Sequence, residues 1–196
     1  MGDRELAGKV QTVLGIITPG DLGVTLPHEH LLMAGEVYFK EPDSASEKKL
    51  AYQPVNMENL SWVRYHMKDN LDNLRLLDEE MATREAMMFK LAGGQTITDL
   101  TIVGLGRDPL ALARISRVTG LNIVMGSGYY IEVTYPQGFL NDKTESGIAE
   151  EIIHDITVGV DDTDIRSGMI GELGCSWPLG DGERKVLRGG AIAQQE

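Results

Sequence analysis

Cysteine is almost absent from this chain of 196 residues, in which Cys175 is the only one. One cysteine excludes a disulfide within the chain, so we expect a reducing compartment, the cytoplasm. Positive charge is also scarce: 18 lysines and arginines stand against 30 aspartates and glutamates, for a formal net charge of −12. This imbalance argues against a nucleic-acid-binding surface, because nothing would offset the repulsion of the phosphates.

Long hydrophobic runs are missing as well. No stretch reaches the roughly 18 apolar residues that a membrane helix needs, and residues 1–5 lack the apolar segment of a signal peptide. Hydrophobic residues nevertheless make up 42% of the chain and charged residues 24%, which is ordinary for a globular protein. We therefore expect no membrane partner, and a globular chain with one sizeable core or two small ones.

Strand-like and helix-like segments alternate along the chain. The apolar pattern predicts strands at residues 9–17, 24–32, 95–101, 121–128 and 169–173. Periodicity of three to four residues predicts helices at residues 78–90, 109–119 and 143–158, and an amphipathic segment from Asp181 onward. A turn at residues 18–21 would join the first two strands into a short hairpin.

Two less regular segments separate the second strand from the first strong helix. Residues 34–57 have a mixed composition and predict a long surface excursion. Residues 58–75 carry a weaker helical pattern. In the helix that follows, we expect Met81, Met87 and Met88 to fill the core, because methionine adapts to irregular gaps.

The order of strands and helices predicts an α/β fold with a parallel sheet covered by helices. Two architectures fit this order, an open doubly wound sheet and a closed eightfold barrel. The glycines at Gly104 and Gly106 do not form a dinucleotide-binding fingerprint, because the G-x-G-x-x-G pattern fails at Pro109. The pattern alone therefore leaves both architectures open.

The second strand carries the most informative pair of residues, His28 and His30. Side chains two apart on a strand point to the same face, so both imidazoles can reach one metal ion while Glu29 faces away. Histidine is a frequent zinc ligand. An H-x-H pair alone also fits a partly buried or surface pair, so the metal interpretation requires further ligands downstream.

Other polar residues follow the later strands. Asp99 comes after the second βα strand, Tyr129 and Tyr130 after the third, and Glu172 lies on the fourth. In parallel α/β folds, this carboxyl edge of the sheet is where ligands bind. A carboxylate in a buried strand is costly unless it is paired or bound to metal, so Glu172 is a candidate ligand; a solvent-exposed strand end is the alternative.

The other two histidines and the cysteine are weaker candidates for a functional site. His66 and His154 lie in helical segments without a suitably spaced partner, so we expect them to be structural. Cys175 has no evident activating base. Two histidines and a carboxylate without a Ser–His pattern therefore favour metal-assisted hydrolysis. With two metal ions, a bridging carboxylate would set their spacing at about 3.5–4 Å.

The ordered motifs of the chain resemble those of the phosphotriesterase family in the amidohydrolase superfamily, and its phosphotriesterase-related branch in particular. Residues 13–15 and 21–31 look like the opening signature of the family, and residues 103–108 resemble its second-strand loop. Residues 120–130 are similar to its third strand, and residues 171–179 to the fourth-strand motif of the branch. The resemblance extends over essentially the whole chain.

This resemblance implies a TIM (β/α)8 barrel with a binuclear metal centre, usually zinc, at its C-terminal face. His28 and His30 would bind the more buried metal, and Glu172 would stand at the position of the bridging ligand, with a catalytic role. Tyr130 would line the substrate pocket together with Tyr129. The resemblance makes Arg107 and Asp108 a structural pair in the second-strand loop.

The family pattern also requires residues that this chain does not contain: two histidines on the fifth and sixth strands and an aspartate on the eighth. We therefore expect residues 1–196 to form the N-terminal portion of one barrel domain, with the first four βα units preceded by a hairpin, and to be a fragment or a truncated product. Such a half-barrel would leave two open sheet edges and an exposed apolar inner face, which favour aggregation.

Two functions follow from these features. The full-length protein would hydrolyse an ester, lactone, phosphotriester or small N-acyl amide such as N-acetyltaurine, with two divalent metal ions, a small-molecule substrate and the option of a homodimer. Alternatively, the chain is catalytically inactive and acts as a binding or interaction module. An open α/β protein unrelated to metals is a third reading, and the ordered motifs argue against it.

Overall fold

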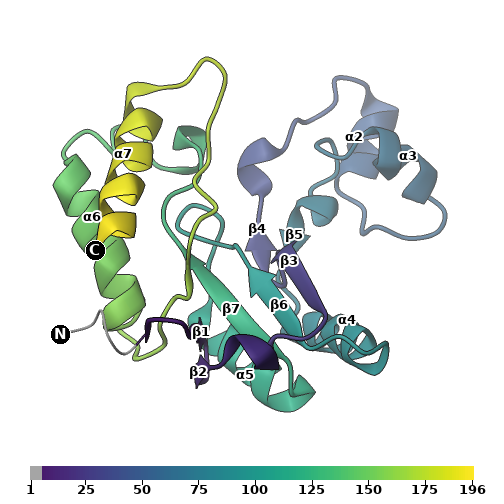
Figure 1. Cartoon of the computed structure of the whole chain (residues 1–196). Helices are drawn as coiled ribbons and strands as arrows, with labels where there is room; N and C mark the ends of the chain where they lie inside the picture. The colour runs from purple at the N-terminus through teal and green to yellow at the C-terminus, as the bar shows by residue number, and fades with distance from the viewer. Residues whose placement is uncertain (1–5) are drawn as a thin grey trace.

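The computed structural model describes residues 6–196 and is built on one parallel sheet of four strands. The strands are β3 (Thr25–Glu29), β6 (Thr96–Asp99), β7 (Asn122–Ser127) and β8 (Met169–Ile170), in the spatial order β3-β6-β7-β8. Sequence order and spatial order agree, and the sheet curls as part of a barrel wall (Figure 1). The polar N-terminal residues 1–5, from which we expected no signal peptide, lie outside the described residues.

After each strand of the sheet, one helix packs against the sheet. These are α4 (Glu79–Leu91), α5 (Pro109–Thr119), α6 (Glu145–Thr157) and α7 (Asp181–Gln195). In Figure 1, α6 and α7 lie side by side on one flank of the sheet, and α4 and α5 lie beneath it. No helix within residues 6–196 is both long enough and apolar enough to cross a membrane.

The helices begin where the sequence offers capping side chains. Asp78, Asp108 and Thr144 each accept a hydrogen bond from the backbone N–H three residues later, which satisfies one otherwise free donor of α4, α5 and α6. Helix α5 ends at Gly120, whose φ of 66° is a left-handed conformation that glycine adopts without steric cost. The helices predicted at residues 78–90, 109–119 and 143–158 are confirmed, and the amphipathic segment from Asp181 forms α7.

The main core lies between the sheet and its helices. Ile97 of β6 and Ile123 of β7 are paired in register and point to the same face, where they pack with Ala86 of α4 and Ile115 of α5. A second cluster joins Tyr129 and residues of α6 and α7. Both clusters form on the outer face of the sheet, which identifies the barrel architecture rather than a doubly wound sheet with helices on both faces.

The N-terminal hairpin differs from the prediction. A single strand was expected at residues 9–17, but the chain folds back within this segment as β1 (Val10–Thr12) and β2 (Gly15–Ile17), which pair antiparallel. Residues 18–21, predicted as the hairpin turn, instead contain the 3₁₀ helix η1 (Pro19–Asp21). A hydrogen bond from the Val13 N–H to the Ile123 carbonyl, 2.9 Å long, holds the hairpin against β7.

The excursion predicted after the second strand is an ordered lobe, drawn at the upper right of Figure 1. Its elements are β4 (Met33–Ala34), η2 (Glu36–Tyr38), α2 (Ala45–Ala51), α3 (Leu60–Tyr65), η3 (Asp72–Leu74) and β5 (Arg75–Leu76). Strands β4 and β5 pair at the base of the lobe and close it. The helix predicted at residues 58–75 is thus restricted to the six residues of α3.

Two further predictions about local structure were wrong. Met81 and Met88 of α4 are exposed, whereas Ala82 and Ala86 are the buried residues of that helix. Strand β8 ends at Ile170, so Glu172 lies in the segment after the strand rather than within it. The fourth strand is short because only Met169 and Ile170 pair with β7.

Candidate metal centre

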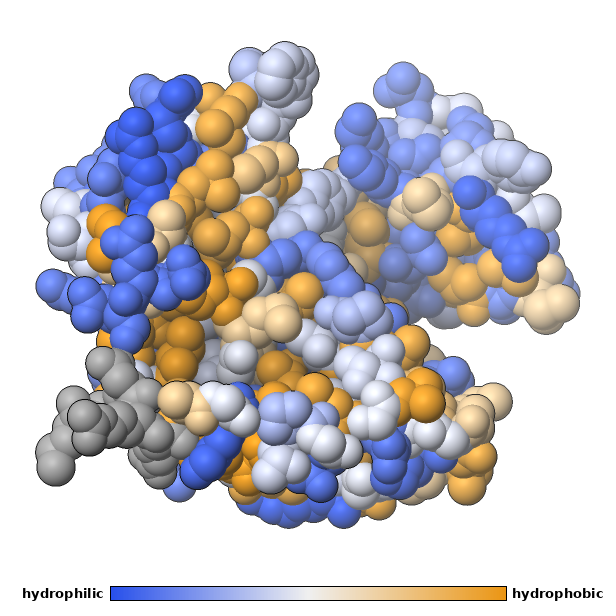
Figure 2. Space-filling model, viewed as in Figure 1, coloured by the Kyte–Doolittle hydropathy of each residue, from blue (hydrophilic) through white to orange (hydrophobic). Residues whose placement is uncertain are grey.

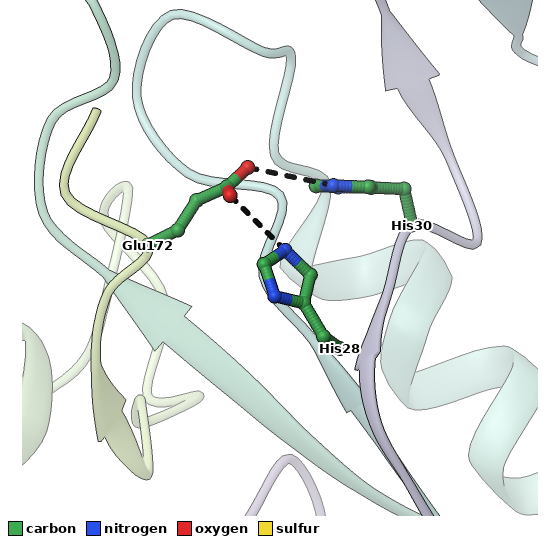
Figure 3. Close-up of side chains that lie close together, drawn as sticks. All are labelled: His28, His30 and Glu172. Atoms are coloured by element: carbon green, nitrogen blue, oxygen red, sulfur yellow. Dashed lines mark ion pairs between the residues drawn. The ribbon is translucent and has the colours of Figure 1, made fainter. Parts of the chain in front are cut away.

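Three side chains converge beyond the carboxyl ends of the first and fourth strands (Figure 3). His28 Nε2 lies 3.0 Å from Glu172 Oε2, and His30 Nε2 lies 3.4 Å from Glu172 Oε1. His30 and Glu172 are largely buried, with side chains 23% and 22% exposed, whereas His28 is 53% exposed. The sequence therefore identified three residues, from two distant segments, that meet in space.

Strand β3 positions the two histidines. His28 lies within the strand and His30 directly follows it, so the alternation of the backbone directs both rings to the same side. Their ring centroids are 5.7 Å apart. The predicted common face of the H-x-H pair is confirmed by this arrangement.

Close backbone packing against β7 positions Glu172. The Gly171 N–H donates to the Ser127 carbonyl over 2.7 Å, and the Gly174 N–H donates to the Tyr129 carbonyl over 3.2 Å. These two bonds hold the segment that carries Glu172 beside the end of β7. The carboxylate is consequently turned across the sheet toward β3 (Figure 3).

Hydrogen bonds also fix the ring of His30 from behind. Its Nδ1 lies 3.0 Å from Thr101 Oγ1. The carboxylate of Asp99, a fully buried residue, accepts hydrogen bonds from the Leu31 and Thr101 backbone N–H groups, at 2.7 and 2.9 Å. The sequence indicated Asp99 as a strand-end residue, but it missed Thr101, which the D-x-T spacing could have identified as a same-face partner.

Two tyrosines lie near this group of residues, one from each side. Burial raises the pKa of Tyr38, and the neighbouring Tyr130 hydroxyl and the charge of Glu172 raise it further. Tyr38 belongs to η2 of the lobe, whereas Tyr130 follows β7, and both are half-buried. Tyr38 could not be identified from the sequence, because an irregular excursion gives no signal of which side chain faces the sheet.

The structure places Tyr129 differently from the prediction. Its ring is buried against Tyr135 and Phe139, and its hydroxyl bonds to Glu151 of α6, so it faces the helices rather than the two histidines. Backbone alternation explains the difference, since consecutive residues point to opposite sides. Tyr130 is thus the tyrosine of this pair on the side of Glu172.

The other histidines do not join the group. His66 pairs with Asp69 at 2.9 Å and stacks on Trp62 within the lobe, and His154 lies in the last turn of α6. Within residues 6–196, the group of three potential ligands is therefore His28, His30 and Glu172.

The donor set of this group fits a divalent metal ion. One ligand atom from each residue can be chosen so that all three lie within 4.8 Å of one another. Imidazole nitrogens and carboxylate oxygens suit zinc and related ions, and a catalytic zinc site commonly has three protein ligands and one open position. The same two histidines would repel a metal ion if protonated, so metal and protons compete for this group.

Comparison with known proteins gives the family. Residues 8–196 match the phosphotriesterase family over almost the whole chain. The chain belongs to the phosphotriesterase family. This is a family of metal-dependent hydrolases, in agreement with the donor set found here.

Within the phosphotriesterase family, the chain is similar to proteins named N-acetyltaurine hydrolase. It is 42% identical to the protein of Xenopus tropicalis over 192 residues, which cover 97% of this chain and 54% of the relative. It is 38% identical to the protein of Dictyostelium discoideum over 211 residues, which cover 97% of this chain and 57% of the relative. The chain thus spans about half the length of these curated relatives.

Solved structures of the phosphotriesterase family confirm the partial barrel. A resiniferatoxin-binding protein from Rhodobacter sphaeroides superimposes with a TM-score of 0.93 at 39% identity, covering 96% of this chain and 52% of that one. An organophosphorus hydrolase from Deinococcus radiodurans superimposes with a TM-score of 0.70 at 26% identity, covering 96% of this chain and 50% of that one. The four βα units therefore correspond to half of such a barrel.

Proposed function

We propose that this chain carries the N-terminal half of the active site of a zinc-dependent hydrolase. The observation that supports the proposal is the convergence of His28, His30 and Glu172 beyond the carboxyl ends of β3 and β8. Active sites of eightfold barrels lie at this end of the strands. We propose small N-acyl amides such as N-acetyltaurine as substrates of the whole protein, because the similar curated relatives bear that name.

In the proposed centre, His28 and His30 would hold one metal ion, and Glu172 would be the carboxylate ligand shared with a second. Bound zinc supplies a water of lowered pKa and polarises the oxygen of the scissile group. Glu172 is placed to share a metal ion with the two histidines, because its carboxylate oxygens lie 3.0 and 3.4 Å from their Nε2 atoms. Esters, lactones and phosphotriesters are the alternative substrates, since a family neighbour is named an organophosphorus hydrolase.

The surrounding residues of the chain would orient the substrate. We propose that Tyr130 contacts it from the β7 side, that Tyr38 contacts it from the lobe, and that the buried Tyr129 supports the Tyr130 loop from behind. A small-molecule substrate, a cytoplasmic location and a homodimer of the whole protein complete the proposal. The single, exposed and free Cys175 is consistent with a reducing compartment.

A second function deserves a test, because residues 6–196 provide three ligands where a binuclear centre needs more. The chain alone would then bind metal weakly and act as a binding module without turnover. The two proposals differ in what happens when the barrel is completed. Only the hydrolase proposal predicts activity once the missing strands are supplied.

The first experiment measures zinc in the purified chain by mass spectrometry after dialysis, for the native sequence and for His28→Asn and Glu172→Ala. We expect both substitutions to remove bound zinc. His154→Asn is the matched control, since that histidine lies on α6, outside the group. Equal zinc in all four proteins would refute the metal centre.

The second experiment mixes the chain with a separately produced C-terminal half of the Xenopus tropicalis relative. Hydrolysis of N-acetyltaurine by the mixture, and its loss with Glu172→Ala, would support the hydrolase proposal. Zinc binding by the chain without hydrolysis in any stable mixture would favour the binding module.

A further inference from the structure

The parallel sheet ends in two unpaired edges. Among residues 6–196, β3 pairs only with β6 at one end of the sheet, and β8 pairs only with β7 at the other. The superposition on the Rhodobacter sphaeroides structure covers 52% of that chain with a TM-score of 0.93, so the sheet has the curvature of half a barrel. Four more parallel strands of the same curvature would therefore close it.

The β3 edge adjoins an apolar cavity of about 700 Å³ between β3 and α4. Leu26, Ile97 and Phe89 line it, together with Met81 and Glu85 of α4. Helix α5 covers the opposite flank of α4, whereas Met81 and Glu85 are exposed on the flank beside the cavity. Glu85 has no hydrogen bond or ion pair with any residue that the structure describes. This side of the chain is thus apolar with a negative charge beside it.

The opposite end of the sheet presents one uncovered flank of α7. A Cβ atom at Gly189 would meet α6, and one at Gly190 would meet the segment after β8. Successive residues of a helix point about 100° apart, so these two glycines define the flanks that face α6 and the sheet. Leu187 and Arg184 lie farther round in the same sense, on the side away from α6, and both are exposed. Arg184 makes an ion pair with Asp181 over 3.7 Å, which is a long and exposed contact.

The two sides complement each other in shape and in charge. The β3 side offers an apolar cavity with the carboxylate of Glu85 beside it, and the α7 side offers Leu187 with the guanidinium of Arg184 beside it. Opposite charges on facing surfaces favour and orient association. A two-fold rotation about the barrel axis keeps all strands parallel and brings the α7 side of each copy to the β3 side of the other.

We propose that two copies of this chain close one eight-stranded barrel. In this dimer, β8 of each copy pairs in parallel with β3 of its partner, and α7 covers the partner's cavity between β3 and α4. Both sheet edges are then paired, so assembly stops at two copies. The dimer also brings two groups of His28, His30 and Glu172 to the same end of one barrel, although its formation requires no metal.

Sedimentation velocity of the metal-free chain in EDTA, at about 0.15 M salt, tests this dimer. We expect a dimer that dissociates on dilution. Glu85→Lys and Arg184→Glu should each raise the Kd of the dimer about tenfold or more, because each substitution places like charges in both interfaces. An equimolar mixture of the two variants should recover the native Kd. In the mixed dimer, one interface joins the two altered sides with opposite charges, and the other joins two native sides.

Two matched controls make the same changes of net charge elsewhere. Glu58→Lys and Arg64→Glu alter exposed residues of the α2–α3 lobe and should leave the Kd of the dimer close to its native value. Far-UV circular dichroism establishes that each variant is folded. Equal weakening of the dimer by the controls would indicate general repulsion and would overturn the assignment to Glu85 and Arg184.

Other outcomes would also overturn the proposal. A native chain that remains monomeric, or that forms species growing beyond the dimer with concentration, excludes a closed pair. Weakening by Glu85→Lys but not by Arg184→Glu would indicate that two β3 sides face each other. A monomer that binds the separately produced C-terminal half of the Xenopus tropicalis relative would assign the cavity to that half.

Zinc measurements on the same samples separate this inference from the proposed metal centre. A dimer that binds no zinc would retain the closed pair and exclude the metal centre. A monomer that binds zinc would retain the metal centre and exclude the closed pair.

Discussion

Glu172 can approach the two histidines because the neighbouring strand β7 carries no side chain at Gly126. A Cβ atom at Gly126 would lie 2.1 Å from the Gly171 carbonyl oxygen, which is closer than any real contact. The backbone just before Glu172 therefore rests directly on β7. The geometry of the candidate site depends on a residue that contributes no chemistry to it.

Gly126→Ala should consequently damage both stability and the site. Overpacking of this kind costs about 1–3 kcal/mol, and displacement of Gly171 should weaken zinc binding through Glu172. Urea unfolding and zinc titration measure the two effects. Gly20→Ala is the control, because its Cβ would meet only Thr18 Oγ1, at 3.7 Å. Native stability and zinc affinity in Gly126→Ala would contradict the argument.

Glu183 at the start of α7 predicts a dependence of stability on acid. Burial raises the pKa of Glu183, but hydrogen bonds from the Ser176 N–H and hydroxyl and from the Glu132 and Gly180 N–H groups outweigh it, so the pKa lies below its ordinary range. A folded-state pKa below the unfolded value stabilises the fold above the unfolded pKa. That contribution is lost as pH falls from about 4.3 through the folded value.

We expect the free energy of unfolding to fall in this acid range, and the difference between the native chain and Glu183→Gln to shrink with it. Urea unfolding between about pH 5.5 and 3 measures both quantities. The control is Glu80→Gln on the exposed face of α4, which should change stability by no more than about 0.5 kcal/mol. A constant difference across the range would show that the Glu183 carboxylate does not act in this way.

Between elements, Arg107 connects the loop after β6 with the end of α6. Its side chain is 4% exposed, and its guanidinium bonds to Asp155 at 2.7 Å and to Asp161 at 3.2 Å. Asp155 also accepts a hydrogen bond from the Ser127 hydroxyl of β7, at 2.8 Å. The structural role that family resemblance implied for Arg107 is therefore the joining of three segments through one buried charge.

Arg107→Met should lower the free energy of unfolding by about 3–5 kcal/mol, because it leaves the carboxylate of Asp155 without its countercharge. Arg84→Met is the matched control, since Arg84 pairs with Glu80 on an exposed helix face. Arg84→Met should lower the free energy of unfolding by about 0.3–0.5 kcal/mol. Urea unfolding measures both free energies. Similar losses of stability in the two variants would refute the role of Arg107 as a buried countercharge.

The sequence predicted the helices well, because the signals that begin and end them are local. Asp78, Asp108 and Thr144 lie at the capping positions of α4, α5 and α6, and Gly120 ends α5. The hairpin was wrong because a strand of nine residues and two strands of three share the same composition. Only the pairing of β1 with β2 distinguishes them, and that pairing is not encoded in periodicity.

Only part of the candidate site was predicted, because the sequence shows local patterns but not contacts between distant segments. His28, His30 and Glu172 could be identified because polar residues stand out in apolar strands and because the motif order is typical of the family. Thr101 and Tyr38 were missed, since their roles depend on which side chains they approach across the fold. Exposure of Met81 was missed because a helical pattern does not show how closely another element covers each face of the helix.

The whole chain presents a large apolar surface. Val24, Met81, Met88 and Leu91 are exposed. An apolar cavity of about 700 Å³ opens between β3 and α4. Figure 2 shows apolar surface continuing from the segment beside α7 toward the sheet, and a hollow between that side and the α2–α3 lobe. Such patches favour association, while the net charge of −12 opposes it.

The 196-residue chain alone should therefore associate more strongly as salt screens its charge. Sedimentation velocity at low and high ionic strength measures this effect. Met81→Glu, beside the cavity, should reduce association. Met57→Glu adds the same charge at an exposed position in the lobe and should have little effect. Equal effects of the two variants would indicate general repulsion rather than contact through the α4 surface.

Strand β3 has β6 on one side and, among residues 6–196, no strand on the other. In a parallel ladder, successive backbone amides point alternately to the two sides of a strand. The amides of β3 that point away from β6 should thus exchange rapidly with deuterium, and those bonded to β6 slowly; Pro27 has no amide, and the register shifts between Leu26 and Glu29. Because His28 lies on this strand and His30 directly follows it, slower exchange of the rapidly exchanging amides would report that another strand pairs with β3 beside the candidate metal centre.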